Sequence, residues 1–173
     1  MKILIQLFEI IILRRRPQDI LYDSSAAVIT FMAAIATSYF SVVLAGSFAQ
    51  PLAFVVAQVV TQAVIFYCLL AIARKQGRFV QTITALFGVS AILQFVALII
   101  LQLPGLSILG LIVTAWNFYL MIIILREAID CSTLQSILIT VLYHFIIGFV
   151  LLMLFPDIFE RMQSMMLEAQ SAT

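Results

Sequence analysis

Uncharged polar side chains interrupt the long apolar stretches of this 173-residue chain, and they are its main candidates for chemistry. The set comprises Gln62, Gln94, Trp116, Asn117 and His144. Amide, indole and imidazole groups exchange hydrogen bonds and can hold a polar ligand, but none is a carboxylate or an activated nucleophile. His144 is the only histidine, so we expect no histidine-based metal site within one chain.

The charged side chains that enzymes and coupled transporters use are missing from the apolar stretches. No Asp, Glu, Lys or Arg occurs in residues 24–73, 79–125 or 131–155. Coupled transporters usually keep at least one such group near the middle of the membrane. The chain also has no HExxH motif, no paired carboxylates, no glycine-rich phosphate loop and no Cys/His cluster. The sequence therefore predicts no catalytic residue, no cofactor and no metal.

The composition requires lipid rather than water around most of the chain. Hydrophobic residues make up 65%, charged residues 10%, and the mean hydropathy is +1.22. Soluble domains are about a quarter charged, and they could not bury this much apolar surface. The net charge is only +1, so nucleic acid is not an expected partner. We expect an all-α, polytopic integral membrane bundle.

Length divides the apolar stretches into five membrane-spanning helices. Residues 24–73 would measure about 75 Å as one helix, against a hydrocarbon core of roughly 30 Å, so this stretch must turn once. Gly46 and Pro51 supply that turn, and Leu103-Pro104-Gly105 supplies the turn within residues 79–125. The last stretch suffices for one span. The predicted spans, two hairpins and a single helix within a membrane domain of residues 17–155, are 24–46, 52–73, 80–102, 107–125 and 133–155.

Eight of the nine Lys and Arg residues lie on one side of this threading. They are Lys2, Arg14, Arg15, Arg16, Arg74, Lys75, Arg78 and Arg126. Basic segments stay in the cytoplasm, and carrying a charge through the bilayer centre costs about 2.5–3.5 kcal/mol. We therefore expect a cytoplasmic N-terminus and an extracytoplasmic C-terminus. All of these residues except Lys2 form the predicted cytoplasmic basic face, which is expected to meet anionic lipids.

Both ends of the chain are predicted to form amphipathic helices at the membrane surface. Residues 1–16 place Lys2, Gln6 and Glu9 on one helical stripe, and they end in arginines where a signal peptide would have a small-residue cleavage site. This helix is expected to lie on the cytoplasmic leaflet. Residues 156–173 are expected on the outer side, with apolar side chains at helical spacing. These side chains are Ile158, Phe159, Met162, Met165 and Met166.

The uncharged polar residues fall at similar depths in the predicted spans. Gln62, Trp116, Asn117 and His144 lie near the span centres, and Gln94 lies about 5 Å from its own. Because hydrocarbon offers no hydrogen-bond partner, such groups turn inward and pair. One hypothesis is a midplane hydrogen-bonded layer that joins spans two to five, has His144 at its hub and serves a ligand or ion path. The alternative is ordinary adhesion between helices, worth about 0.6 kcal/mol per bond.

The links between spans contain helix caps and the two cysteines. Asp23, or one of the two serines after it, can cap the first span, and Asp130 or Ser132 can cap the fifth. The link around Arg126 is interpreted as a solvated hinge. The alternatives are that Arg126 pairs with Glu127 or Asp130, or that it meets the Arg-rich N-terminus through lipid phosphate. Cys68 and Cys131 both lie toward the predicted cytoplasmic side, where thiols stay reduced, so no disulfide framework is implied.

Two segments carry a recognisable pattern. One is Leu13-Arg14-Arg15-Arg16-Pro17-Gln18-Asp19, and the other runs from Trp116 through Tyr119-Leu120-Met121-Ile122-Ile123-Ile124-Leu125-Arg126-Glu127-Ala128 to Ser132. This pattern resembles the Yip family of five-span membrane proteins in the short form found in bacteria. The resemblance implies five spans and a cytoplasmic N-terminus, in agreement with the threading. It covers essentially the whole chain.

The same resemblance limits what can be expected of function. Eukaryotic Yip proteins act in vesicle trafficking and bind Rab-type GTPases and one another, but Asp19-Ile20-Leu21-Tyr22-Asp23 only faintly matches their acidic-Leu-Tyr motif. Rab binding is therefore not implied, and neither is any reaction. We expect a non-enzymatic scaffold or assembly partner in a bacterial cytoplasmic membrane, in contact with other membrane proteins or with itself. The alternative is a small transporter or channel subunit that uses the polar layer within an oligomer.

Overall fold

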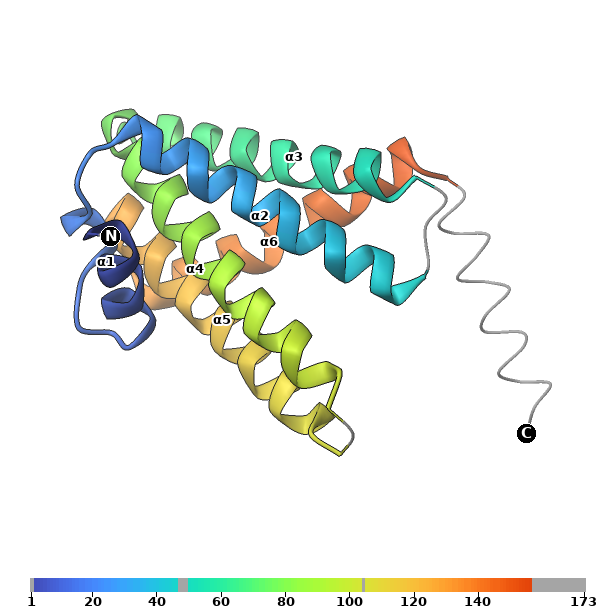
Figure 1. The fold of residues 1–173 in the computed structure, drawn as a ribbon. Coiled ribbons are helices and arrows are strands. Elements are labelled where there is room, and N and C mark those ends of the chain that lie inside the picture. The colour runs from blue at the N-terminus through green and yellow to red at the C-terminus, as the bar shows by residue number, and fades with distance from the viewer. Residues whose placement is uncertain (1, 47–49, 104, 157–173) are drawn as a thin grey trace.

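The computed structural model describes residues 2–46, 50–103 and 105–156, and every regular element in these ranges is helical (Figure 1). The long helices are α2 (Ser24–Ala45), α3 (Pro51–Ile72), α4 (Phe79–Leu101), α5 (Ser107–Ile129) and α6 (Thr133–Leu154). A short helix precedes them, and two 3-10 turns lie in the links: α1 (Lys2–Ile11), η1 (Pro17–Asp19) and η2 (Gln76–Arg78). All five long helices have the length and hydropathy of membrane spans, which confirms the predicted class and span number.

The helix ends agree with the predicted spans to within one residue, except at the end of α5. That helix continues beyond Leu125 to Ile129. Arg126 therefore lies in the last turn of α5, where a cation interacts favourably with the negative end of the helix dipole. At the other end of the bundle, the predicted surface helix of residues 156–173 lies outside the described residues apart from Pro156.

Side-chain caps explain where two of the helices begin. Asp23 accepts a hydrogen bond from the backbone N–H of Ser25 at 2.9 Å and so caps α2. Ser132 caps α6, because it accepts from the backbone of Gln135 while the Gln135 side chain accepts from the backbone of Ser132. Asp130, the other candidate for this role, instead ends α5 in a left-handed conformation with φ of 52°.

The helix at the centre of the bundle is α4. It packs against α2 on one side and α5 on the other, and it also meets α1 and α3 (Figure 1). Ala85 and Val89 on α4 are almost fully buried. By contrast, the outer helices expose large apolar side chains such as Ile72 and Phe145. A helix that is apolar on every side is typical of a membrane bundle, where lipid covers what the protein does not.

One face of α1 is inserted into the bundle. Leu7 and Ile10 are each only 2% exposed, whereas Phe8 on the opposite face is 54% exposed. The approach is close because α4 has a glycine there: a Cβ atom at Gly88 would lie 2.6 Å from Leu7 Cδ1. Gln6, which was expected on a polar stripe, is buried with the others, and its Oε1 has no hydrogen-bond partner in the described part of the chain. The amphipathic pattern of α1 thus also serves packing onto α4.

The bundle opens away from α1. In Figure 1, α4 and α5 run together as one hairpin, α3 and α6 diverge from it, and α2 lies against α4 between them. Near the closed side, the rings of Phe66 and Tyr143 stack with centroids 4.9 Å apart and join α3 to α6. Phe31 and Phe87 meet edge to face at 5.4 Å and join α2 to α4. Aromatic contacts thus hold the helices together on the side where the polar groups described below converge.

Replacing Gly88 with valine should displace α1 and lower the free energy of unfolding by about 1–3 kcal/mol, the usual cost of overpacking. The reason is the short distance to Leu7, whose side chain has little free space around it. Unfolding by SDS in mixed micelles measures the change. Gly148→Val is the matched control, since it makes the same substitution in the middle of α6 but a Cβ there meets nothing within 4 Å. Equal stabilities of the two variants would contradict this account of α1.

Candidate functional site

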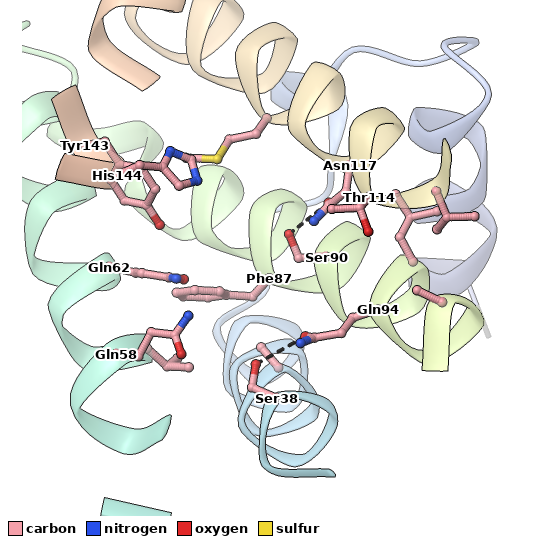
Figure 2. Close-up of a pocket in the computed structure, with 16 residues that line it drawn as sticks. Ser38, Gln58, Gln62, Phe87, Ser90, Gln94, Thr114, Asn117, Tyr143 and His144 are labelled. Carbon is pink, nitrogen blue, oxygen red and sulfur yellow. Dashed lines mark hydrogen bonds between the residues drawn. The ribbon is translucent and has the colours of Figure 1, made fainter. Parts of the chain in front are cut away.

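A polar cavity of about 280 Å³ lies inside the bundle, between α2, α3, α4, α5 and α6 (Figure 2). Four of the five side chains predicted to share a midplane layer line it: Gln62, Gln94, Asn117 and His144. The cavity therefore brings together residues that are far apart in the sequence. Other polar groups in its lining are Ser38, Gln58, Ser90, Thr114 and Tyr143.

Gln94 is the most connected side chain of this cavity. Its Oε1 accepts hydrogen bonds from Ser38 Oγ at 3.2 Å and Thr37 Oγ1 at 3.4 Å, and its Nε2 donates to Ser41 Oγ at 3.0 Å. Ser90, one turn before it on α4, donates to Asn117 Oδ1 on α5 at 3.2 Å (Figure 2). The central helix is thus joined to both of its neighbours by polar contacts within the apolar part of the bundle.

His144 is not the hub of a polar layer, contrary to the prediction. Its Nδ1 lies 2.7 Å from the backbone oxygen of Thr140 on the same helix. A carbonyl oxygen can only accept, so this contact places a proton on Nδ1. The ring packs against Phe118 at 5.1 Å and Tyr143 at 4.9 Å, and no hydrogen bond in the described part of the chain joins it to Gln62 or Asn117. His144 borders the cavity without linking its walls.

Trp116 does not belong to the cavity either. Its Nε1 donates to the backbone oxygen of Ile11 at 3.1 Å, which fastens the end of α1 to α5. Consecutive residues of a helix point in different directions, so Trp116 and Asn117 share a depth but not a face. The carbonyl of Ile11 is among those that the last turn of α1 leaves without an intrahelical donor.

The hydroxyl groups that complete the cavity contacts were not predicted from the sequence, in particular those of Thr37, Ser41 and Ser90. Thr37 and Ser41 also donate to backbone oxygens on their own helix, at 3.0 and 2.9 Å. Ser and Thr commonly satisfy themselves in this way, so their presence in a span does not signal an inter-helix contact. The usable signal was the spacing of Ser38 and Ser41, which lie on one face of α2.

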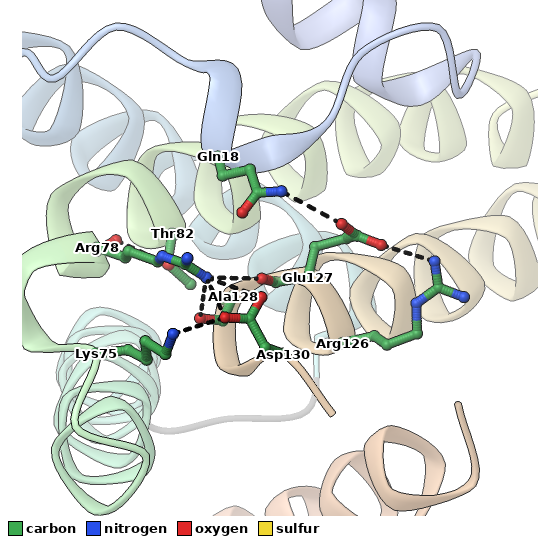
Figure 3. Close-up of polar contacts among 8 residues, drawn as sticks. All are labelled: Gln18, Lys75, Arg78, Thr82, Arg126, Glu127, Ala128 and Asp130. Carbon is green, nitrogen blue, oxygen red and sulfur yellow. Dashed lines mark hydrogen bonds and ion pairs between the residues drawn. The ribbon is translucent and has the colours of Figure 1, made fainter. Parts of the chain in front are cut away.

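At one end of the bundle, the link after α3 is held against the end of α5 by ion pairs and hydrogen bonds (Figure 3). We call this region, formed by residues 13–20, 74–81 and 126–133, the basic end. The carboxylate of Asp130 accepts from Lys75 Nζ at 2.7 Å and from Arg78 Nη1 at 3.1 Å. The same guanidinium nitrogen donates to the backbone oxygens of Glu127 and Ala128, at 3.2 and 3.3 Å. Arg78 therefore satisfies carbonyl groups that the end of α5 leaves unpaired.

A second group of contacts ties η1 to the same end. Glu127 pairs with Arg126 at 2.7 Å, which was one of the alternatives to a solvated hinge, and accepts a longer contact of 3.5 Å from Gln18 Nε2. Gln81 Nε2 on α4 donates to the backbone oxygens of Gln18 and Ile20, at 3.2 and 2.8 Å. The segment after α1 is thereby held against both α4 and α5.

The seven residues of the predicted basic face divide into paired and unpaired cations. Lys75, Arg78 and Arg126 form the ion pairs just described, and Arg15 pairs with Glu9 at 3.2 Å. The remaining three have no ion pair in the part of the chain that the structure describes: Arg14, Arg16 and Arg74. The positive charge that is left over therefore sits in the link after α1 and at the start of the link after α3.

Charge and burial shift two pKa values at the basic end. Hydrogen bonds from Lys75 and Arg78 lower the pKa of Asp130 below its ordinary value of 3.8. Partial burial raises the pKa of Cys131 above its ordinary value of 9.0. Since the thiolate is the reactive form, a raised pKa makes Cys131 a poor nucleophile. Both cysteines are free thiols.

Five apolar helices with a buried α4 at their centre, a polar cavity between them and an ion-paired basic end define a polytopic helical membrane protein. The chain matches the Yip1 domain over residues 13–155 and therefore belongs to the Yip1-domain family, as the resemblance implied. Proteins with this domain are generally non-enzymatic proteins of membrane trafficking. No curated protein and no solved structure matches the chain. Among the described residues, no three His, Cys, Asp or Glu side chains are grouped to hold a metal ion.

Substituting leucine for Gln94 should lower the free energy of unfolding by about 0.6–1.7 kcal/mol, the range measured for hydrogen bonds between membrane helices. The cost stays modest because Thr37 and Ser41 keep their own-helix acceptors. SDS unfolding in mixed micelles is the measurement. Gln58→Leu is the control, since Gln58 lines the same cavity but makes no side-chain hydrogen bond within the described residues. If both variants lose the same stability, the contacts of Gln94 to α2 are not what joins these helices.

Asp130→Asn should lower the thermal unfolding temperature at neutral pH. Asparagine tolerates the left-handed backbone, so the variant removes the charge without adding strain. Because the folded-state pKa of Asp130 is depressed, its contribution is complete above the ordinary value of 3.8 and is lost as the pH falls through the lowered pKa. The difference between wild type and variant in detergent should therefore vanish in acid. Asp19→Asn is the control, since it removes an exposed carboxylate without an ion pair in the described chain, and it should leave the unfolding temperature at neutral pH close to that of wild type.

Proposed function

We propose that this Yip1-domain protein is a non-enzymatic membrane scaffold that assembles with other membrane proteins or with a second copy of itself. The observation that carries the proposal is the network at the basic end. It joins residues 55 positions apart, as in Lys75 and Asp130, and 109 apart, as in Gln18 and Glu127. Such contacts fix η1, η2 and the ends of α4 and α5 relative to one another. A surface with fixed geometry is what a docking partner requires.

The orientation of the scaffold follows from the distribution of charge. We propose that the basic end faces the cytoplasm of a bacterium and lies at the inner membrane surface, since basic links resist translocation. Arg14, Arg16 and Arg74 then point their unpaired charge toward anionic headgroups or soluble acidic groups. A reporter fused after Thr173 tests this: it must be found on the extracytoplasmic side, and a cytoplasmic reporter overturns the assignment.

The outer faces of the helices supply the area for assembly within the membrane. Ile72 is 82% exposed and Phe145 74% exposed, and they lie on α3 and α6. Apolar exposure alone does not drive helix association in lipid, because lipid tails cover such side chains equally well. The fixed basic end therefore contributes the specificity of docking, while the apolar faces adapt to lipid or to a neighbouring helix.

Two differently tagged copies, co-expressed, cross-linked in intact membranes and extracted in mild detergent, should yield a complex of discrete mass. Its composition, both tags together or one tag with another membrane protein, identifies the partner class. Arg78→Gln should lower the yield of this complex because it frees η2 from α5. Lys2→Gln removes one cation outside the network and should leave the yield unchanged. A chain that remains a lone monomer after cross-linking argues decisively against the scaffold.

The polar cavity favours a second candidate, a small transporter or channel subunit. Four predicted layer residues line a space of about 280 Å³ in the apolar part of the bundle, which hydrocarbon tails would fill poorly. Purified protein in proteoliposomes, assayed for flux of small polar solutes, separates the two functions. Flux that Asn117→Leu abolishes supports the transporter; no flux together with a discrete complex supports the scaffold.

A further inference from the structure

A second pocket, of about 550 Å³, lies at the basic end between the link that follows α1 and the last turns of α5. Arg14, Arg15 and Arg16 line one side, and Arg126 lines the other. The start of α6 closes it at Thr133, whose Oγ1 accepts from Arg126 Nη1 at 3.4 Å. Its volume falls within the usual range for ligand pockets, roughly 300–1,000 Å³.

The charge of the pocket selects an anion. Four arginines line it against two carboxylates, Asp19 and Glu127. Glu127 is already engaged by Arg126, and Arg15 is engaged by Glu9. Arg14 and Arg16 are exposed and make no ion pair within the described residues. A guanidinium presents paired N–H donors that match the oxygens of a phosphate, so phosphate is the anion that this arrangement suits.

The rest of the lining selects an amphiphile. Below the arginines, Tyr119, Ile122 and Ile123 form an apolar wall on α5, and Leu13 adds to it. This wall continues along a membrane-spanning helix toward the hydrocarbon, with Tyr119 46% exposed. A soluble phosphate would leave the wall uncovered, whereas a lipid would place its headgroup at the arginines and an acyl chain along α5. Aromatic and basic side chains are the usual anchors at this depth.

From these two properties we propose that the pocket is a specific site for an anionic phospholipid, with its phosphate held by Arg14, Arg16 and Arg126. The site is independent of the scaffold proposal and of orientation, because it requires only that the basic end lie at a membrane surface. A lipid seated there contacts the link after α1, the end of α5 and the start of α6 at once. It therefore adds to the hydrogen bonds that already join these segments, such as Gln18 to Glu127 and Arg126 to Thr133.

Native mass spectrometry of the full chain in mild detergent tests the site, with phosphatidylglycerol, phosphatidylcholine and inorganic phosphate as the probes. Phosphatidylglycerol should bind with a stoichiometry of one and be preferred to phosphatidylcholine. The double variant Arg14→Gln, Arg16→Gln should weaken it about 25-fold, since each cation near a membrane surface contributes about fivefold. The control Lys2→Gln, Arg74→Gln removes equal charge outside the pocket and should bind like wild type.

A variant that is expected to bind more tightly separates the effect of the site from misfolding, because a misfolded chain would lose binding. Asp19→Asn removes a carboxylate from the lining and should strengthen phosphatidylglycerol about fivefold. In wild-type protein, a photoreactive phosphatidylglycerol should label residues 13–17 or 119–126. Unchanged binding in both pocket variants, or labelling confined to other segments, overturns the proposal. Competition by inorganic phosphate at equal concentration assigns the pocket to a soluble anion and overturns the lipid.

Discussion

Hydrocarbon accepts no hydrogen bonds, and this constraint decides where each polar side chain of the bundle can lie. Apolar contacts alone favour no particular register between helices, because lipid tails cover apolar side chains equally well. In this bundle the register is set by a few hydrogen bonds on the most buried helix, α4: Gln94 bonds to α2, and Ser90 bonds to α5. Their neighbours on α4 are small or apolar, so these contacts fix the relative height of the three helices without adding charge.

The basic end satisfies backbone and side chains with the same groups. Helix α5 leaves carbonyl oxygens free at its end, and Arg78 donates to two of them while also pairing with Asp130. Asp130 reaches this position because it adopts a left-handed conformation, which aspartate tolerates better than most residues. The arrangement neutralises Lys75 and Arg78, and among the described residues of the predicted basic face it leaves Arg14, Arg16 and Arg74 without an ion pair.

Span number and helix ends could be predicted because they depend on length, charge and turn residues, all of which are local. Counting from the span centres grouped five side chains, and four of them do line one cavity. Which side of each helix faces the interior could not be predicted, because a helix that is apolar on every side has no amphipathic stripe to orient it. For this reason the sequence did not reveal that Trp116 donates to the end of α1, or that His144 bonds to a backbone oxygen of its own helix. The pairing of Arg126 with adjacent Glu127 was accessible from sequence, whereas that of Lys75 with Asp130 required the fold.

Three nearby residues of α5 point to three different parts of the molecule. Trp116 holds the end of α1, Asn117 meets Ser90 in the cavity, and Tyr119 lines the basic pocket while its ring lies 5.4 Å from that of Trp116. A rotation of α5 that improved one of these contacts would misplace the other two, since all three are fixed to one rigid backbone. The docking of α1 on Gly88 of α4 holds α1 in place for the contact with Trp116. The short first helix is thus a structural part of the membrane domain, and the shapes of both the cavity and the pocket depend on it.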